Sequence, residues 1–353
     1  MKVLGVCGGN GAVLYPFLEN LIGNIEPRSA FKTPDNRQWK LNFHNIPLIN
    51  KMADKPLIQG WDMEWNKQFK GVDIIIGHPD CGNSSMLAYS RGKKLTNPRK
   101  NQSVILFSES ISRLKPKFFL FENLPKFLEN FTAEEINEYF CNYRLKMFTG
   151  SVSKWGNSQV NRKRLVIVGI RRDLHGYKKY FKLPDPKDFI LSTTRELIHD
   201  LVSEDEKPIM GHIREKLDDV VTLYGGFKQS LRDIQIGWTT HLKDKQRWEV
   251  IDRKFTSAPG VYKNLPEKYP NTVRKGNREF NYNGLMMSPR ERARIQGIPD
   301  YFKIWVDYGK KKLAINKGRL STTKCFPYEI SEWFYKCIKE IDKNEPKIWT
   351  NTR

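Results

Sequence analysis

The sequence predicts an α/β fold built on a doubly wound, mostly parallel sheet of the Rossmann type. Short apolar stretches typical of buried strands recur in the first half of the chain, at the start of 2–14 and at 72–76, 118–121 and 165–170. Apolar residues with helical spacing lie between them, at 103–114 and near 133–141. Because strands that alternate with helices are typical of parallel sheets with crossover helices, this alternation predicts the fold class.

Composition narrows the possible functions. The chain has 353 residues, enough for one large domain and a smaller one. Its formal net charge of +22 favours a polyanionic partner, most often nucleic acid, over a surface that is merely rich in lysine. The five cysteines have no paired spacing, so we expect a reducing compartment without disulfides or a metal site. The sequence has no membrane-length apolar run and no signal-peptide pattern, so we expect a cytoplasmic protein.

One stretch, residues 71–87 with the sequence GVDIIIGHPDCGNSSML, is central to the functional prediction. It predicts a buried strand that ends abruptly and presents Cys81 just beyond its end. In parallel sheets, ligands and catalytic groups lie past the carboxyl ends of the strands. Cys81 is therefore either an inert buried thiol, the common state of a free cysteine, or a nucleophile.

Charged side chains at other predicted strand ends point to the same region. Glu122 and Asn123 end the strand that begins at 118. A carboxylate there is costly to bury without purpose, although an ion pair with a nearby arginine would also account for it. Arg162 and Arg164 alternate into the strand at 165–170, so we expect them either to contact DNA phosphate or to fix a carboxylate such as Glu122.

The glycine-rich turn after the first strand, with glycines at 8, 9 and 11, lets the backbone approach a ligand closely. Leu14 stands where a dinucleotide-binding turn has its third glycine, and no Gly-Lys-Ser/Thr follows. The turn therefore favours a nucleoside-type ligand without a pyrophosphate. Asp62 is either a solvated loop residue or an acceptor for an amino group of that ligand.

The alternation of strands and helices stops at about residue 174. Basic residues then interleave with aromatic ones, which suits contact with nucleic acid. A helix follows from the cap Ser288 to Gly297, and an amphipathic helix closes the chain. We therefore predict a catalytic and ligand-binding domain at 1–173, an irregular recognition domain at 174–280 and a segment at 281–353 that packs back on the first domain.

Taken in order, these pieces resemble the DNA cytosine methyltransferases that modify carbon 5. The resemblance covers most of the chain outside the middle domain. It rests on the motifs VCGGNGA (6–12), DIIIGHPDCGNSSM (73–86), FENL (121–124), NRKRLVIVGIRR (161–172) and SPRERARIQGIPD (288–300), the last being the most specific. It implies a Rossmann-like methyltransferase sheet with a smaller, irregular target-recognition domain.

The resemblance implies transfer of a methyl group from S-adenosylmethionine to carbon 5 of a cytosine flipped out of duplex DNA. It implies Cys81 as the nucleophile at carbon 6, Glu122 as the partner of ring nitrogen 3, Asn123 as a positioning residue, and Arg162 and Arg164 as orienting groups. We expect the cofactor to be bound by Cys7, Gly8, Gly9, Asn10, Gly11, Asp62, Pro79 and Lys324. We expect DNA to be bound by Ser85, Gln296 and the basic loop residues Arg91, Lys93, Lys94 and Arg99, whose charge suits a phosphate backbone.

The chain departs from the family's pattern at four positions. Asp80, beside the nucleophile, replaces a proline, and its charge would make a thiolate harder to form unless it is neutralised. His78 is also off the pattern, and Gln159 is displaced by one position. Lys324 replaces a neutral asparagine and would repel a sulfonium. Either Asp80 balances Lys324, or the cofactor is carboxy-S-adenosylmethionine and the product is a carboxymethyl base.

Two other hypotheses about the function also fit the sequence. The same chemistry on tRNA is one alternative, although a recognition domain of this size favours DNA. A DNA-binding homologue without catalysis is another. We expect double-stranded DNA as the partner of a monomeric enzyme, with a separate restriction endonuclease as a further candidate partner. If the gene belongs to a phage or plasmid, the enzyme would work in the cytoplasm of a bacterial host.

Overall fold

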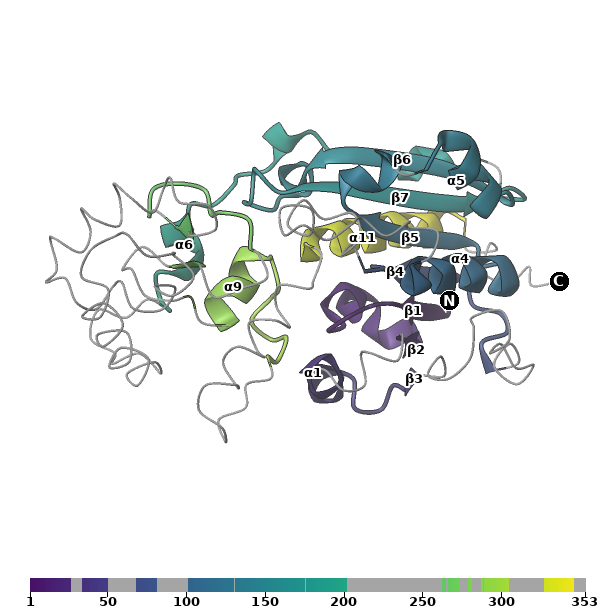
Figure 1. Cartoon of the computed structure of the whole chain (residues 1–353), viewed down its shortest axis with the longest axis horizontal. Helices are drawn as coiled ribbons and strands as arrows, with labels where there is room; N and C mark the ends of the chain where they lie inside the picture. Colours follow the sequence, from purple (N-terminus) through teal and green to yellow (C-terminus); the bar gives the residue numbers. More distant parts are fainter. Residues whose placement is uncertain are drawn as a thin grey trace, which may run out of the picture.

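The computed structural model describes residues 1–26, 34–49, 68–80, 101–129, 131–174, 176–201, 262–264, 266–273, 279–280, 287, 289–304 and 327–345. Over these ranges the fold class predicted from the sequence is confirmed. A central sheet runs through the molecule, and helices cover both of its faces (Figure 1). Within this part of the chain, no helix is long and apolar enough to cross a membrane.

The described sheet has seven strands in the order β3-β2-β1-β4-β5-β7-β6. Its strands are β1 (Val3–Val6), β2 (Leu21–Ile25), β3 (Leu48–Ile49), β4 (Ile74–Gly77), β5 (Phe118–Asn123), β6 (Tyr143–Ser151) and β7 (Lys163–Arg171). Neighbouring strands are parallel except at β7, which runs antiparallel to both β5 and β6. Because β6 and β7 are joined by a short connection without a crossover helix, the chain must reverse between them.

The helical elements of the described ranges are α-helices (α) and 3₁₀ helices (η). They are η1 (Ala12–Asn20), α1 (Pro34–Asn42), α4 (Gln102–Leu114), η5 (Pro125–Glu129), α5 (Ala133–Tyr139), η6 (Val152–Trp155), η7 (Tyr177–Tyr180), η8 (Pro186–Asp188), α6 (Thr194–Ile198), α9 (Pro289–Ile295) and α11 (Tyr328–Asn344). Two short strands, β8 (Tyr262–Lys263) and β9 (Glu279–Phe280), pair in parallel apart from the main sheet. Local signals set the helix ends: Asn101 caps α4 through the N–H of Ser103, and Thr132 forms a capping box at α5.

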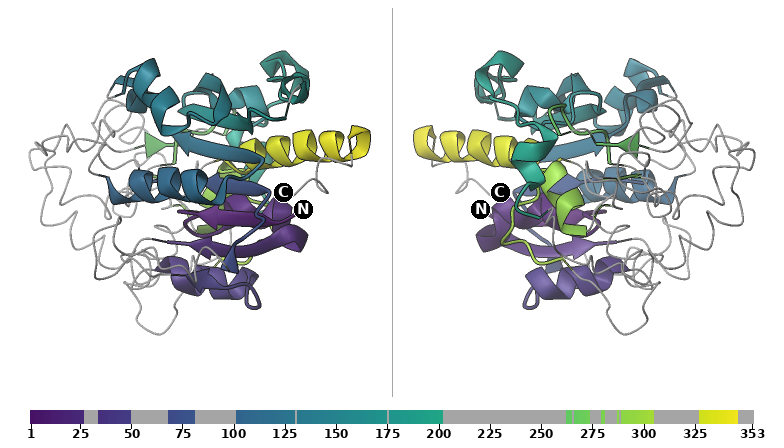
Figure 2. Two further views of the ribbon diagram at one scale, coloured as in Figure 1. Left: turned by 90° about the vertical axis from the view of Figure 1, so that its right-hand side faces the viewer. Right: turned by 90° about the vertical axis from the view of Figure 1, so that its left-hand side faces the viewer.

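The sheet separates two apolar cores, because alternate strand residues point to opposite faces. On β5, Phe118 and Leu120 pack with η1 and α11, whereas Phe119 and Phe121 pack with α4 and α5. Figure 2 shows α4 and α11 on opposite sides of the sheet. With both faces covered, β1 and β4 and the middle parts of β5 and β7 are apolar, which is why these strands could be recognised in the sequence.

The strands predicted from apolar runs are present with bounds shifted by at most two residues. The predicted helices at 103–114 and near 133–141 correspond to α4 and α5. Strand β6 was not predicted from the sequence, and its residues are mostly exposed or half-buried. An edge strand buries little of its surface, so its sequence lacks the continuous apolar run that marked the central strands.

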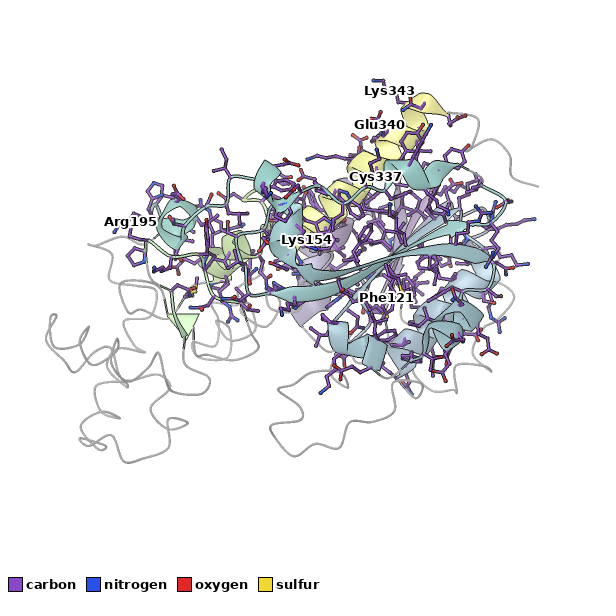
Figure 3. The ribbon with its side chains drawn as sticks, turned by 90° about the horizontal axis from the view of Figure 1, so that it is seen from above. Phe121, Lys154, Arg195, Cys337, Glu340 and Lys343 are labelled. Atoms are coloured by element: carbon purple, nitrogen blue, oxygen red, sulfur yellow. The ribbon has the colours of Figure 1, made fainter. Side chains whose placement is uncertain are left out.

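The chain beyond residue 174 starts on the sheet and then moves away from it. Phe181 is fully buried and its ring packs on Phe334 of α11, with centroids 5.6 Å apart. Figure 3 shows α11 with Cys337 near its middle and Glu340 and Lys343 toward its outer end. The predicted domain boundaries stay predictions, since residues 202–261 lie outside the described ranges.

Helices α6 and α9 form a small unit beside the sheet (Figure 1). Their apolar contact consists of Ile198, Val273, Met287 and Ile295. Arg294 on α9 joins the two helices, because its guanidinium donates to the carbonyl of Leu197 on α6 at 3.3 Å and to Asp200, just after α6, at 2.8 Å. The helix predicted at 289–297 is therefore present as α9, and it packs on the segment of α6.

Candidate active site

Three neighbouring strands bring the predicted site residues to one edge of the sheet. The strands β1, β4 and β5 are parallel, with Val6 in register with Gly77 and Gly77 in register with Phe121. The residues that follow each of these positions must therefore lie at the same edge. This places the turn that begins at Cys7, the loop that begins at His78, and the Glu122–Asn123 pair together.

The loop that leads into Cys81 is held by hydrogen bonds at each of its described residues. The backbone N–H of His78 donates to the carbonyl of Cys7 at 3.2 Å, and the carbonyl of Pro79 accepts from Asn123 Nδ2 at 3.3 Å. The N–H of Asp80 donates to Ser103 Oγ at 2.8 Å, and its carbonyl accepts from the cap of α4, Asn101, also at 2.8 Å.

These hydrogen bonds connect the loop to β1, β5 and α4. They fix the backbone up to the position just before Cys81. Asp80 itself is exposed.

Glu122 is fully buried and each of its carboxylate oxygens meets a basic group. Oε1 forms an ion pair with Arg164 Nε at 2.7 Å, and Oε2 contacts His78 Nδ1. A buried carboxylate is costly unless a positive charge compensates it, and the guanidinium of Arg164 does so. Of the two roles expected for Arg164, the structure shows the contact with Glu122.

Arg162 lies one residue before β7 and has a different environment from Arg164. It is almost fully buried. Its backbone donates to the carbonyl of Gln159 and accepts from Val152, which fixes the connection between β6 and β7. Its charge acts on Glu329 at the start of α11, where it lowers the pKa of that carboxyl against the larger opposite effect of burial.

The turn after β1 has an unusual backbone that side chains of β2 hold in place. Cys7, Gly9 and Gly11 all have positive φ, at 60°, 64° and 88°. A Cβ on Gly11 would lie 2.3 Å from Phe43, so only glycine fits there. The N–H of Gly9 donates to Glu26 Oε1 at 2.6 Å.

Asn24 extends this support from the same strand. Its side-chain oxygen accepts from the N–H of Gly8 at 3.2 Å, and its Nδ2 donates to Glu26 Oε1 at 2.9 Å. Sequence analysis missed both Asn24 and Glu26. The signal available was the polar ending of an otherwise apolar stretch, LIGNIE at 21–26.

Negative charge surrounds the turn. Burial, together with the carboxylates of Glu26 and Asp80, raises the pKa of the Cys7 thiol well above its usual range. Cys7 is therefore a neutral thiol, whose Sγ donates to the carbonyl of Ser103 at 3.7 Å. The same two carboxylates make the surroundings of this turn electrically negative.

A second polar cluster joins the catalytic sheet to α9 and α11. Gln159 is fully buried; its Nε2 donates to the carbonyl of Ile295 at 2.9 Å and to Gln296 Oε1 at 3.2 Å. Its Oε1 accepts from the N–H of Val273 at 2.8 Å. Gln296 is also fully buried, and a contact between it and DNA stays a prediction.

Several of the predicted site residues lie outside the described ranges. They are the proposed nucleophile Cys81, the cofactor candidates Asp62 and Lys324, and the DNA candidates Ser85, Arg91, Lys93, Lys94 and Arg99. The structure brings together the remaining candidates Cys7, Gly8, Gly9, Asn10, Gly11, Pro79, Asp80, Glu122, Asn123 and Arg164 at the edge of the sheet. His78 joins them, although its role was left open in the sequence.

Comparison with known proteins points to one family. The family model described as C-5 cytosine-specific DNA methylase matches residues 35–314, well over half of the chain. The Type II methyltransferase M.FnuDI of Fusobacterium nucleatum is 24% identical over 373 residues, covering 99% of this chain and 97% of that protein. The Type II methyltransferase M.Bpa9945I of Bacillus paralicheniformis is 25% identical over 322 residues, covering 74% and 70%.

A solved structure supports the fold. The methyltransferase EhMeth of Entamoeba histolytica superposes with a TM-score of 0.62 at 14% identity, covering 98% of this chain and 99% of that one. At this identity the likeness shows the fold alone, and it supports the methyltransferase sheet described above.

Proposed function

This chain belongs to the C-5 cytosine-specific DNA methylase family, and from that premise we propose that it works through a covalent adduct of Cys81. The family establishes the coarser statement: the protein is an enzyme that methylates cytosine in DNA with S-adenosylmethionine. The observation that carries the finer proposal is the buried Glu122, held by Arg164 and His78 beside the loop that enters Cys81.

The proposed chemistry follows from the nature of cytosine. Carbon 5 is a poor nucleophile, so the Cys81 thiolate adds to carbon 6 and pushes electron density into the ring. Glu122 bonds to ring nitrogen 3, where negative charge would otherwise build up, and so stabilises the adduct. Loss of the carbon-5 proton and expulsion of Cys81 then release the modified base. Because these atoms are covered in the stacked duplex, the base must first be flipped out.

The roles of the neighbouring residues follow from their contacts. Arg164 holds the Glu122 carboxylate in one orientation, because its Nε lies 2.7 Å from Oε1. Asn123 bonds to the carbonyl of Pro79 and so ties the end of β5 to the nucleophile loop. Arg162 is proposed to orient the same region from the connection before β7. Asp80 is anchored through its backbone, and its carboxylate is proposed to act on charge near Cys81.

The turn after β1 fits the cofactor. S-adenosylmethionine, when bound, supplies an electrophilic methyl group on a positively charged sulfonium. The carboxylates of Glu26 and Asp80 give this turn a negative environment that suits a cation. Gly8, Gly9, Asn10 and Gly11 would offer backbone groups, Cys7 and Pro79 would line the site, and Glu26 would accept hydrogen bonds from hydroxyl groups.

The proposal predicts activity that depends on Cys81 in cells. Bisulfite sequencing of DNA from cells that express the chain should show protected cytosines in one sequence context. The Cys81→Ala variant should leave the same DNA fully converted. Protection that persists in Cys81→Ala would contradict the covalent mechanism, and no protection with the native chain would contradict the activity proposed for it.

The remaining alternatives can be separated by product and substrate. The carboxymethyl alternative depends on Lys324, which lies outside the described residues, and mass spectrometry of nucleosides distinguishes it from 5-methylcytosine. Transfer to duplex DNA measured beside transfer to tRNA decides the substrate. We further propose that the enzyme acts as a monomer on duplex DNA, and that any restriction endonuclease is a separate protein.

A further inference from the structure

His78 occupies a position that the resemblance to the family leaves unexplained. It stands where the family's nucleophile loop has glycine, three residues before Cys81. Its backbone N–H is fixed to the carbonyl of Cys7 at 3.2 Å. Its side chain is only 15% exposed and its Nδ1 contacts Oε2 of the fully buried Glu122. The imidazole is therefore built into the site.

The chemistry proposed for Glu122 requires a proton that the carboxylate itself does not carry. Nitrogen 3 of neutral cytosine has a lone pair and no hydrogen, and an ionised carboxylate is likewise only an acceptor. Two acceptors repel each other unless a proton lies between them. The guanidinium of Arg164, whose Nε lies 2.7 Å from Oε1, keeps its own protons and cannot supply the missing one.

We propose that His78 is a positioning residue that stores this proton and supplies it to nitrogen 3 through Glu122. This inference rests on the proposed function of Glu122. Before cytosine binds, the proton resides on His78 and forms an imidazolium–carboxylate pair. When nitrogen 3 arrives, the N–H bond at Nδ1 breaks and an O–H bond forms on Glu122.

The proton balance closes over one turnover. Glu122 passes the proton to nitrogen 3 as the Cys81 sulfur–carbon bond forms, and His78 is then neutral. When Cys81 leaves, nitrogen 3 returns the proton to Glu122 and Glu122 returns it to His78. No proton is consumed on this path, and the proton lost from carbon 5 leaves separately to solvent.

Charged and titratable groups from several elements lie around His78. Glu122 on β5 contacts it, Arg164 on β7 lies behind Glu122, Asp80 follows in the same loop, and Cys7 at the end of β1 is a neutral thiol. The proposed transfer needs the shared proton, and a sufficiently high pH removes it. Activity should therefore fall on the alkaline side.

The test is the single-turnover rate of methyl transfer to duplex DNA, measured from about pH 5.5 to 9 in full-length protein. His78→Asn keeps a hydrogen-bond donor near Nδ1 but cannot store a proton. We expect its rate at about pH 7.5 to fall about 10- to 100-fold, with the alkaline fall moved to lower pH by about one unit or more. Half-saturation by DNA and by cofactor should change less than twofold. The matched control is His44→Asn at an exposed histidine, which should behave like the native enzyme.

Two outcomes separate this inference from the function on which it rests. If the native enzyme transfers a methyl group and His78→Asn shows the same rates and the same pH profile, the role of His78 is overturned while the Cys81 chemistry stands. If the native enzyme transfers no methyl group and forms no adduct with 5-fluorocytosine DNA, the proposed function itself fails. Thermal melting checks that His78→Asn is folded, and His78→Gln replaces it if it is not.

Discussion

Glu122 and Glu329 are two glutamates that are at least partly buried and that contact different partners. Glu122, at the end of β5, is fully buried between Arg164 and His78. Glu329, in the first turn of α11, is partly buried, and both of its carboxylate oxygens accept from Asn157 Nδ2, at 3.0 Å each. Burial raises the pKa of Glu329 to about 7, even though Asn157 and Arg162 lower it.

The difference shows how the same side chain serves two purposes. The Glu122 carboxyl, with a guanidinium and an imidazole against its oxygens, is held in place where ring chemistry needs it. A carboxyl whose direct bonds come from an amide changes charge near neutral pH and holds two segments together. We therefore expect changes at the Glu122 site to alter catalysis, and changes at the Glu329 site to alter stability and its pH dependence.

The largest effect is expected from Arg164→Met, which removes the cation from the Glu122 site. Breaking a buried ion pair by removing one partner typically costs about 3–5 kcal/mol, because the other charge stays buried. We expect a loss of unfolding free energy near the lower end, about 3 kcal/mol, since Arg164 is 13% exposed and His78 still contacts Glu122.

The single-turnover methylation rate should fall at least as much in Arg164→Met as in His78→Asn, each compared with the native enzyme. Denaturant titration and single-turnover transfer would measure the two quantities. Native-like activity in Arg164→Met would contradict the claim that changes at the Glu122 site, unlike those at the Glu329 site, alter catalysis.

A smaller effect on stability is expected from Gln159→Ala. The variant removes four buried hydrogen bonds, to Asn157, Val273, Ile295 and Gln296. Leaving their partners unsatisfied should cost about 2–3 kcal/mol of unfolding free energy. Because none of these bonds involves Glu122, Arg164 or His78, formation of the Cys81 adduct on saturating DNA should change little. A loss of adduct formation as large as that in Arg164→Met would show that the clusters are not separate.

The smallest effect is expected from Glu329→Gln, and its sign depends on pH. The folded state holds the Glu329 proton up to about pH 7, whereas the ordinary value is 4.5. Between these values the folded state binds more protons than the unfolded state, so native stability falls as pH rises through this window. The amide that replaces the carboxyl has no such proton to lose.

We therefore expect Glu329→Gln to match the native protein at about pH 5 and to exceed it by about 1–2 kcal/mol at about pH 8. Asn157 retains one oxygen acceptor in the variant. Thermal melting at the two pH values would measure the difference. Equal differences at both pH values would show that Glu329 does not titrate in this range.

Much of the fold could be predicted because the central strands are apolar on both faces. Ile74, Ile76, Phe118 and Leu120 mark their strands without help from distant residues. The edge strand β6 could not be recognised, since its exposed residues carry no such pattern. The placement of β7 between β5 and β6 depends on pairings between residues far apart in the chain, which no local pattern contains.

The candidate site could likewise be predicted only in part from the sequence. Glu122 and the glycines of the β1 turn were predicted from their position after apolar strands. The contact between Arg164 and Glu122 was one of two alternatives until the sheet brought β5 and β7 together. His78, Glu26 and Gln159 gain their roles from contacts with residues far away in the chain, so the sequence held only weak signals of them.

The contrast between the two glutamates is tested most directly by trapping. Duplex DNA with 5-fluorocytosine in the target site should capture Cys81 in a stable adduct that a denaturing gel resolves. At about pH 7.5 we expect Glu122→Gln to form this adduct about 100-fold more slowly than the native enzyme, and Glu329→Gln to form it at the native rate. Equal rates for the native enzyme and Glu122→Gln would contradict the assignment of Glu122 to the chemistry.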